Sequence, residues 1–104
     1  MVKVFISYKL RQGVTSEEYA EWSRRVDQPM ASRQPGVLRY EIYEVENGAE
    51  GEEWCDVMEV IEAESWGDWK KVNTYPEMLD AVEEWRKISQ PDSVRVVYGA
   101  QIEP

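Results

Sequence analysis

The sequence predicts one α+β domain whose strands and helices follow the order β-α-β-β-α-β. Three observations support this prediction. A chain of 104 residues has the length of a single compact domain. Four segments are rich in β-branched and aromatic residues, as is typical of strands. Between the first and second of these segments, and between the third and fourth, apolar residues recur at helical spacing.

The first half of the chain predicts a strand over 2–10, a helix after residue 15 and a strand over 37–45. Thr15 is followed three positions later by Glu18, which is the pattern of a capping box at a helix start. Pro29 should bend or end this helix late, and Pro35-Gly36 predicts a turn before the second strand. The expected buried faces are Val4, Ile6 and Tyr8, then Tyr19, Trp22, Val26 and Met30, then Leu38, Tyr40 and Ile42.

The second half predicts an acidic hairpin loop over 47–52, a strand over 54–62, two helical segments and a strand over 94–102. The first helical segment spans residues 65–72. Thr74 and Glu77 form a second apparent capping box, so we expect another helix there. Its expected apolar stripe is Met78, Leu79, Val82 and Trp85, and Val94, Val96, Tyr98 and Ala100 should share a face of the last strand.

This order of elements is the ferredoxin-like split βαβ arrangement, with a four-stranded antiparallel sheet. Both helices would pack on one face of the sheet. The strand over 54–62 is largely apolar on both faces, because Cys55, Val57 and Ile61 alternate with Trp54, Met58 and Val60. The sequence therefore predicts a homodimer in which a second sheet covers the free face, forming a dimeric α/β barrel. The alternative is a monomer with a semi-polar free face.

Composition excludes several classes of function. The net charge of −9 argues against nucleic acid and anionic membranes as partners. The chain contains no histidine, which removes Ser-His-Asp and Cys-His catalysis and His-ligated haem, zinc or iron. Neighbouring acidic residues do not converge on one ion, so we expect no metal and no cofactor. Cys55 is the only cysteine, and with no recognisable signal peptide it favours a cytoplasmic location.

Three stretches carry a resemblance to a known superfamily. Residues 14–22, Asp27-Gln28-Pro29 and residues 35–42 resemble the dimeric α/β-barrel superfamily, including its EthD-like and antibiotic-biosynthesis-monooxygenase-like members. Asp27 stands where the EthD-like pattern has histidine. That difference, with residues 57–62 and 76–82, resembles the RedY-like/HapK group of prodigiosin-type pigment pathways. The resemblance implies a small-molecule pocket and a part in the biosynthesis of a tripyrrole pigment.

Two carboxylates are the candidate catalytic residues. Glu59 interrupts the apolar run of a buried strand, and a buried carboxylate requires a partner or a raised pKa. Asp27 occupies the motif position and could orient a ligand N–H or act as an acid or base. The alternatives are a structural pair between Glu59 and Arg39 or Arg95, and an exposed Asp27 paired with Arg24.

The candidate ligand-binding residues are Ser7, Tyr40, Trp66, Trp69 and Tyr75. Trp66 and Trp69 lie three positions apart on a short predicted helix and could form an aromatic wall, although core packing is the alternative. The expected ligand is a small aromatic or pyrrole-like molecule. The chain would then be a binding protein or a cofactor-free enzyme. A non-catalytic accessory protein that binds a pathway enzyme, and a cofactor-free monooxygenase, remain alternatives.

Overall fold

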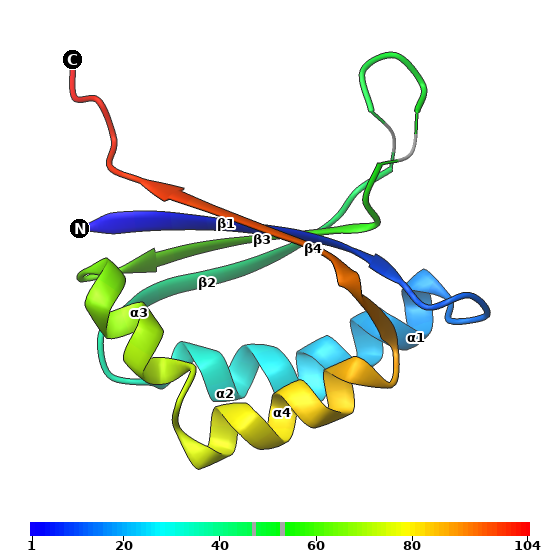
Figure 1. Cartoon of the computed structure of the whole chain (residues 1–104), viewed down its shortest axis with the longest axis horizontal. Helices are drawn as coiled ribbons and strands as arrows, with labels where there is room; N and C mark the ends of the chain where they lie inside the picture. Colours follow the sequence, from blue (N-terminus) through cyan, green and yellow to red (C-terminus); the bar gives the residue numbers. More distant parts are fainter. Residues whose placement is uncertain (47, 53) are drawn as a thin grey trace.

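Four antiparallel strands form one layer of the protein, and the helices cover one face of that sheet (Figure 1). The computed structural model describes residues 1–46, 48–52 and 54–104. The strands are β1 (Val2–Leu10), β2 (Val37–Glu44), β3 (Val57–Ala63) and β4 (Ser89–Gly99), in the spatial order β2-β3-β1-β4. This order, with every neighbouring pair antiparallel, confirms the predicted α+β ferredoxin-like fold.

The first helical run contains a widened turn. It consists of α1 (Ser16–Trp22), the π-helical segment η1 (Ser23–Asp27) and α2 (Gln28–Ser32). The predicted capping box is present, because Thr15 Oγ1 accepts from the Glu18 N–H and the Glu18 side chain accepts from the Thr15 N–H. Pro29 was expected to bend the helix or end it late. The run ends at Ser32, shortly after Pro29, and η1 immediately precedes the turn in which Pro29 supplies no N–H.

The second pair of helices is α3 (Trp66–Val72) and α4 (Pro76–Arg86). Ser65 caps α3 through a 3.0 Å bond from the Asp68 N–H. The second predicted capping box was wrong: Tyr75 is the cap of α4 without a side-chain bond, and the Thr74 hydroxyl donates to the Lys71 carbonyl. The predicted stripe of α4 also needs one correction, since Leu79 is 50% exposed and Ala81 is buried in its place.

The turn before β2 approaches α3 closely. Gly36 has a φ of +83°, and a Cβ atom there would lie 2.9 Å from the Cβ of Asp68. Both conditions require glycine at this position. The Pro35-Gly36 turn thus sets β2 directly beside the start of α3, where one wall of the site described below begins.

Three strand predictions were shifted or partly wrong. Leu38 is 53% exposed, because the pairing of β2 with β3 changes register between Val37 and Arg39. Trp54 lies before β3 and is 52% exposed, since the ladder between β2 and β3 begins at Val57. The last strand begins at Ser89 and ends at Gly99. Of the predicted hairpin loop, Asn47 lies outside the described residues.

Two groups of buried residues form the core between the sheet and the helices. One group centres on Val4, Ile61 and Val72, beneath α2, α3 and α4. The other centres on Tyr8, Tyr19 and Trp22, beneath α1. Cys55 is buried as a small core residue, as expected. In the part of the chain that the structure describes, no helix is long and apolar enough to cross a membrane.

The helices leave one face of the sheet free (Figure 1), and apolar side chains lie at the middle of that face among charged and polar ones. Phe5 and Val97 are paired across β1 and β4 on this face, and Val97 is 64% exposed. Met58 and Val60 of β3 lie on the same face and are half-buried in the single chain. The second apolar face predicted for β3 is therefore present, with no helix over it.

Candidate functional site

A cavity of about 630 Å³ lies between the covered face of the sheet and helices α3 and α4. Its walls are mostly apolar and aromatic, and a few polar groups face it from the sheet and from η1. This combination is typical of sites that bind small molecules. The lining residues that matter for the chemistry are Tyr8, Asp27, Tyr40, Glu59, Trp66, Trp69, Lys70 and Trp85.

Glu59 lies at the centre of the sheet, where a charged side chain is least expected. It belongs to the buried face of β3, pairs with Ile6 of β1 and Ile42 of β2, and is only 7% exposed. Its carboxyl group accepts hydrogen bonds from Tyr8 at Oε2 (2.7 Å) and from Tyr40 at Oε1 (3.0 Å). The predicted alternative of a pair with Arg39 is absent, because Arg39 lies 3.9 Å from Glu62 instead.

Asp27 approaches the same cavity from the opposite side. It ends the widened turn η1 and is buried rather than exposed. Its Oδ2 atom lies 3.0 Å from the Tyr40 hydroxyl, so Tyr40 bridges Asp27 and Glu59. The structure thus brings together both candidate catalytic residues and one candidate ligand-binding residue. A widened helical turn is a frequent feature of functional sites, because it displaces side chains from their regular positions.

The bridge through Tyr40 has a consequence for proton count. A phenol has one proton to donate, yet the Tyr40 oxygen contacts a carboxyl oxygen of both Asp27 and Glu59. Tyr40 can donate to one carboxylate and accept from the other only if the second carboxyl group is protonated. Both contacts are therefore satisfied when the Asp27–Tyr40–Glu59 cluster holds one proton in addition to the phenol proton.

The electrostatics of the site favour this state. Burial, and then the charge of Asp27, raises the pKa of Glu59 to about 8, against the opposing effect of the tyrosine hydrogen bonds. Burial raises the pKa of Asp27 to about 6. Among the described residues, neither carboxyl group forms a salt bridge. At neutral pH the pair therefore holds one proton, which Asp27 and Glu59 share through Tyr40.

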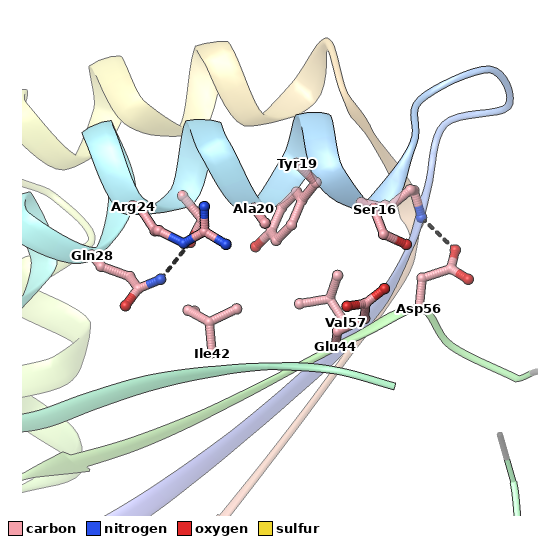
Figure 2. A pocket seen from close by; sticks show the side chains of 11 residues that line it. Ser16, Tyr19, Ala20, Arg24, Gln28, Ile42, Glu44, Asp56 and Val57 are labelled. Atoms are coloured by element: carbon pink, nitrogen blue, oxygen red, sulfur yellow. Dashed lines mark hydrogen bonds between the residues drawn. The ribbon is translucent and has the colours of Figure 1, made fainter. Parts of the chain in front are cut away.

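A chain of hydrogen bonds leads from Glu59 toward a second cavity. Tyr8 donates to Glu59, so its oxygen can accept the proton of Tyr19, with which it also forms a hydrogen bond. Tyr19 lines a smaller cavity of about 190 Å³ between α1 and the strands, together with Arg24, Gln28 and Asp56 (Figure 2). In Figure 2 the Tyr19 ring descends from the helix into this space. The five phenol and carboxyl groups from Tyr19 to Asp27 are thus linked continuously.

The other predicted ligand-binding residues differ in position. Trp66 and Trp69 both line the large cavity, and the ring of Trp66 stacks on Tyr98 with a centroid separation of 3.9 Å. Ser7 does not line this cavity, because it alternates with Ile6 and Tyr8 and belongs to the free face of β1. Tyr75 does not line it either, and packs against the core at the start of α4.

Sequence reasoning assigned Tyr8 and Trp85 to the core and did not name Lys70. All three line the large cavity, and Tyr8 and Trp85 pack edge to face with centroids 5.1 Å apart. The signal that could have identified Tyr8 is its phenol oxygen, because a buried tyrosine hydroxyl requires a hydrogen-bond partner. Glu59 was the buried carboxylate available to provide one.

Comparisons with known proteins agree with this architecture. HapK from Hahella chejuensis has a similar structure, with a TM-score of 0.82 and 14% identity over 100% of this chain and 95% of that one. SnoaB from Streptomyces nogalater, described as a cofactor-independent oxygenase, has a TM-score of 0.75 and 12% identity over 99% and 94% of the two chains. A dimeric ferredoxin-like protein of unknown function from Bacteroides fragilis has a TM-score of 0.72 and 18% identity over 96% and 95%.

At these identities the structural likeness shows the fold alone. No curated protein sequence matches the chain. The model of one protein family, described as REDY-like protein HapK, matches residues 2–102. That match covers nearly the whole sequence, including both carboxylates of the cavity and both aromatic residues of its α3 wall. The chain therefore belongs to the REDY-like HapK family.

Proposed function

We propose that the large cavity binds a flat, N–H-bearing aromatic molecule during the biosynthesis of a prodigiosin-like tripyrrole pigment, with Glu59 as the acid or base. The observation that carries this proposal is the position of the Glu59 carboxyl group, buried among tyrosines and facing a cavity walled by Trp66 and Trp69. Carboxyl oxygens accept hydrogen bonds from N–H groups, and indole rings stack on flat ligands.

The raised pKa of Glu59, about 8, suits proton transfer near neutral pH. A protonated Glu59 can donate a proton to a ligand carbonyl or hydroxyl group, and Asp27 can accept the compensating proton through Tyr40. The reaction would need no cofactor. Membership of the HapK family supports a place in secondary metabolism, and the fold is shared with the cofactor-independent oxygenase SnoaB.

A binding titration tests the proposal. Purified protein is titrated with 2,2′-bipyrrole while tryptophan fluorescence is recorded. We expect saturable quenching, because Trp66 and Trp69 line the cavity. Affinity should fall about tenfold in Glu59→Gln, the scale of one lost hydrogen bond. Glu84→Gln, on the exposed face of α4, is the matched control and should bind normally. Absence of quenching in the wild type would contradict the proposal.

Pigment production by cells that carry the pathway distinguishes a catalytic function of this protein from an accessory one. An acid or base at Glu59 predicts that Glu59→Gln abolishes pigment while the purified variant remains folded. The alternative is an accessory protein whose acidic surface, with a net charge of −9, contacts a basic patch on a pathway enzyme. That alternative predicts normal pigment in Glu59→Gln and co-purification of the enzyme.

We also propose that the working form is a homodimer joined through the free face of the sheet. Phe5, Tyr43 and Val97 are exposed on this face, with Met58 and Val60 of β3 between them, and an exposed apolar patch is typical of an interaction surface. The structurally similar protein from Bacteroides fragilis is described as dimeric. Light scattering at micromolar concentration should give twice the mass of the 12.2 kDa chain. A monomeric mass would contradict the dimer.

A further inference from the structure

We infer that the ligand of the large cavity is a planar aromatic cation, and that its binding displaces the proton shared by Asp27, Tyr40 and Glu59. The inference rests on the proposed function and specifies the ligand's charge. Its basis is a mismatch within the described residues: two buried carboxyl groups face one cavity, and no buried cation accompanies them. Lys70 also lines the cavity, but its side chain belongs to an exposed position of α3.

The first step of the argument is the proton count. The two 3.0 Å contacts of the Tyr40 oxygen require one carboxyl proton. Without a bound ligand, that proton neutralises one of the two carboxyl groups. It thereby prevents two carboxylates from being ionised together in a poorly solvated space. Any positive group placed between Asp27 and Glu59 can take over this function, and the proton is then free to leave.

The second step is the path of the departing proton. From Glu59, the proton reaches solvent either through the open part of the cavity or along the chain through Tyr8 and Tyr19. The second route first requires both hydroxyl groups to rotate, because Tyr8 donates to Glu59 in the structure. Each phenol then accepts one proton and releases its own, so no bond other than O–H bonds is made or broken. The chain ends at the smaller cavity that Tyr19 lines, away from a ligand in the large cavity (Figure 2).

The third step concerns the walls. Trp66, Trp69 and Trp85 line the cavity from α3 and α4, and the two carboxyl groups line it from β3 and η1. Indole faces attract cations, and the attraction strengthens when water is excluded. A planar cation in this cavity would have both aromatic rings and carboxyl oxygen atoms as partners. A neutral hydrocarbon would leave the oxygen atoms without a partner.

The experiment uses two probes of the same ring system, which differ in one N-methyl group and the positive charge that it creates. Thioflavin T carries a fixed positive charge on its benzothiazolium nitrogen, and the neutral benzothiazole that lacks this N-methyl group is its control. Each is titrated calorimetrically into the purified protein at pH 7, in phosphate and in Tris buffer. The difference in heat between the buffers measures the protons released. Tryptophan fluorescence and competition with 2,2′-bipyrrole confirm that the probe occupies the large cavity.

We expect thioflavin T to bind about tenfold or more tightly than the neutral probe, because an opposite charge nearby shifts a carboxyl pKa by about one to three units. A shift of that size releases about half a proton or more per cation bound. The neutral probe should release none. Proton release should disappear in Glu59→Gln, and the preference for the cation should disappear in the double variant Asp27→Asn/Glu59→Gln.

A protein with a net charge of −9 attracts any cation weakly, so Glu84→Gln serves as a control that changes the net charge equally at an exposed site. Equal binding of both probes without proton release would overturn the inference and leave the proposed function intact. A cation preference that survives in the double variant would also overturn it. If neither probe nor bipyrrole binds, the proposed function fails as well. The measurement of proton release on the wild-type protein does not depend on whether any variant folds.

Discussion

The Tyr8 hydroxyl donates a 2.7 Å hydrogen bond to Oε2 of Glu59, although 51 positions separate the two residues in the sequence. The bond crosses from β1 to β3, the two central strands of the sheet. It fixes one oxygen of the carboxyl group and leaves the other to Tyr40. The orientation of Glu59 toward the cavity thus depends on the central sheet and not on a loop.

Removal of the Tyr8 hydroxyl should make Glu59 a weaker acid. The bond from Tyr8 lowers the pKa of Glu59, so Tyr8→Phe should move it above its value of about 8. The variant also leaves the Tyr19 hydroxyl without its partner, and we expect the free energy of unfolding to fall by about 1–3 kcal/mol. NMR titration of the carboxyl carbon measures the pKa. Tyr43→Phe, which removes an exposed hydroxyl bonded to Glu41, is the matched control.

Stability should decrease as the pH rises through the range of these carboxyl groups. In the unfolded chain Glu59 ionises near its ordinary value of 4.5, whereas in the folded protein it ionises near 8. Between these values the folded state binds more protons, so the free energy of unfolding falls with increasing pH, by an amount on the order of a few kcal/mol. Asp27 contributes in the same direction up to about pH 6.

Urea denaturation at pH 5, 6.5 and 8 checks this dependence. Glu59→Gln cannot ionise, so its stability should change much less over the same interval, and it should be more stable than the wild type at pH 8. Glu84→Gln should retain the slope of the wild type. Parallel slopes in the wild type and Glu59→Gln would show that Glu59 is not the group responsible.

The order of the elements and the importance of Glu59 could both be predicted from the sequence. Apolar periodicity depends on local geometry, and a carboxylate within an apolar strand is conspicuous in any register. The hydrogen-bond partners of Glu59 were harder to predict from the sequence. Tyr8 and Tyr19 each fit an apolar stripe, so both were assigned to the core. Only the pairing of β1 with β3 shows that the Tyr8 hydroxyl meets the Glu59 carboxyl group, and only the packing of α1 brings Tyr19 to Tyr8.

Register was the other property that local patterns could not provide. Leu38 alternates correctly with Tyr40 and Ile42 in the sequence, but the shift between Val37 and Arg39 removes it from the buried face. The last strand was predicted over 94–102, but β4 begins at Ser89 and includes Pro91. Because β4 is an edge strand, this proline is accommodated where the register shifts between the pairs Ser7–Arg95 and Lys9–Gln90.

Of the two predicted capping boxes, only the one at Thr15 is present, so alanine at Thr15 and at Thr74 should lower the free energy of unfolding by different amounts. Thr15→Ala removes a side-chain oxygen that accepts from the Glu18 N–H at 3.1 Å, and should lower the free energy of unfolding by about 1 kcal/mol. Thr74 caps no N–H of α4, so Thr74→Ala should lower it less. Thermal and urea denaturation of both variants measure the difference. An equal loss would contradict the assignment of Tyr75 as the cap.

A charge on the free face of the sheet should separate the proposed dimer. Val97→Asp places a carboxylate opposite Phe5, within the apolar surface that a second copy would bury, and an unpaired buried charge is unfavourable. We expect a monomer by light scattering at concentrations where the wild type is dimeric. Leu79→Asp is the matched control, since Leu79 is similarly exposed but lies on α4, on the opposite side of the sheet. If Leu79→Asp dissociates the dimer and Val97→Asp does not, the interface lies on the helices.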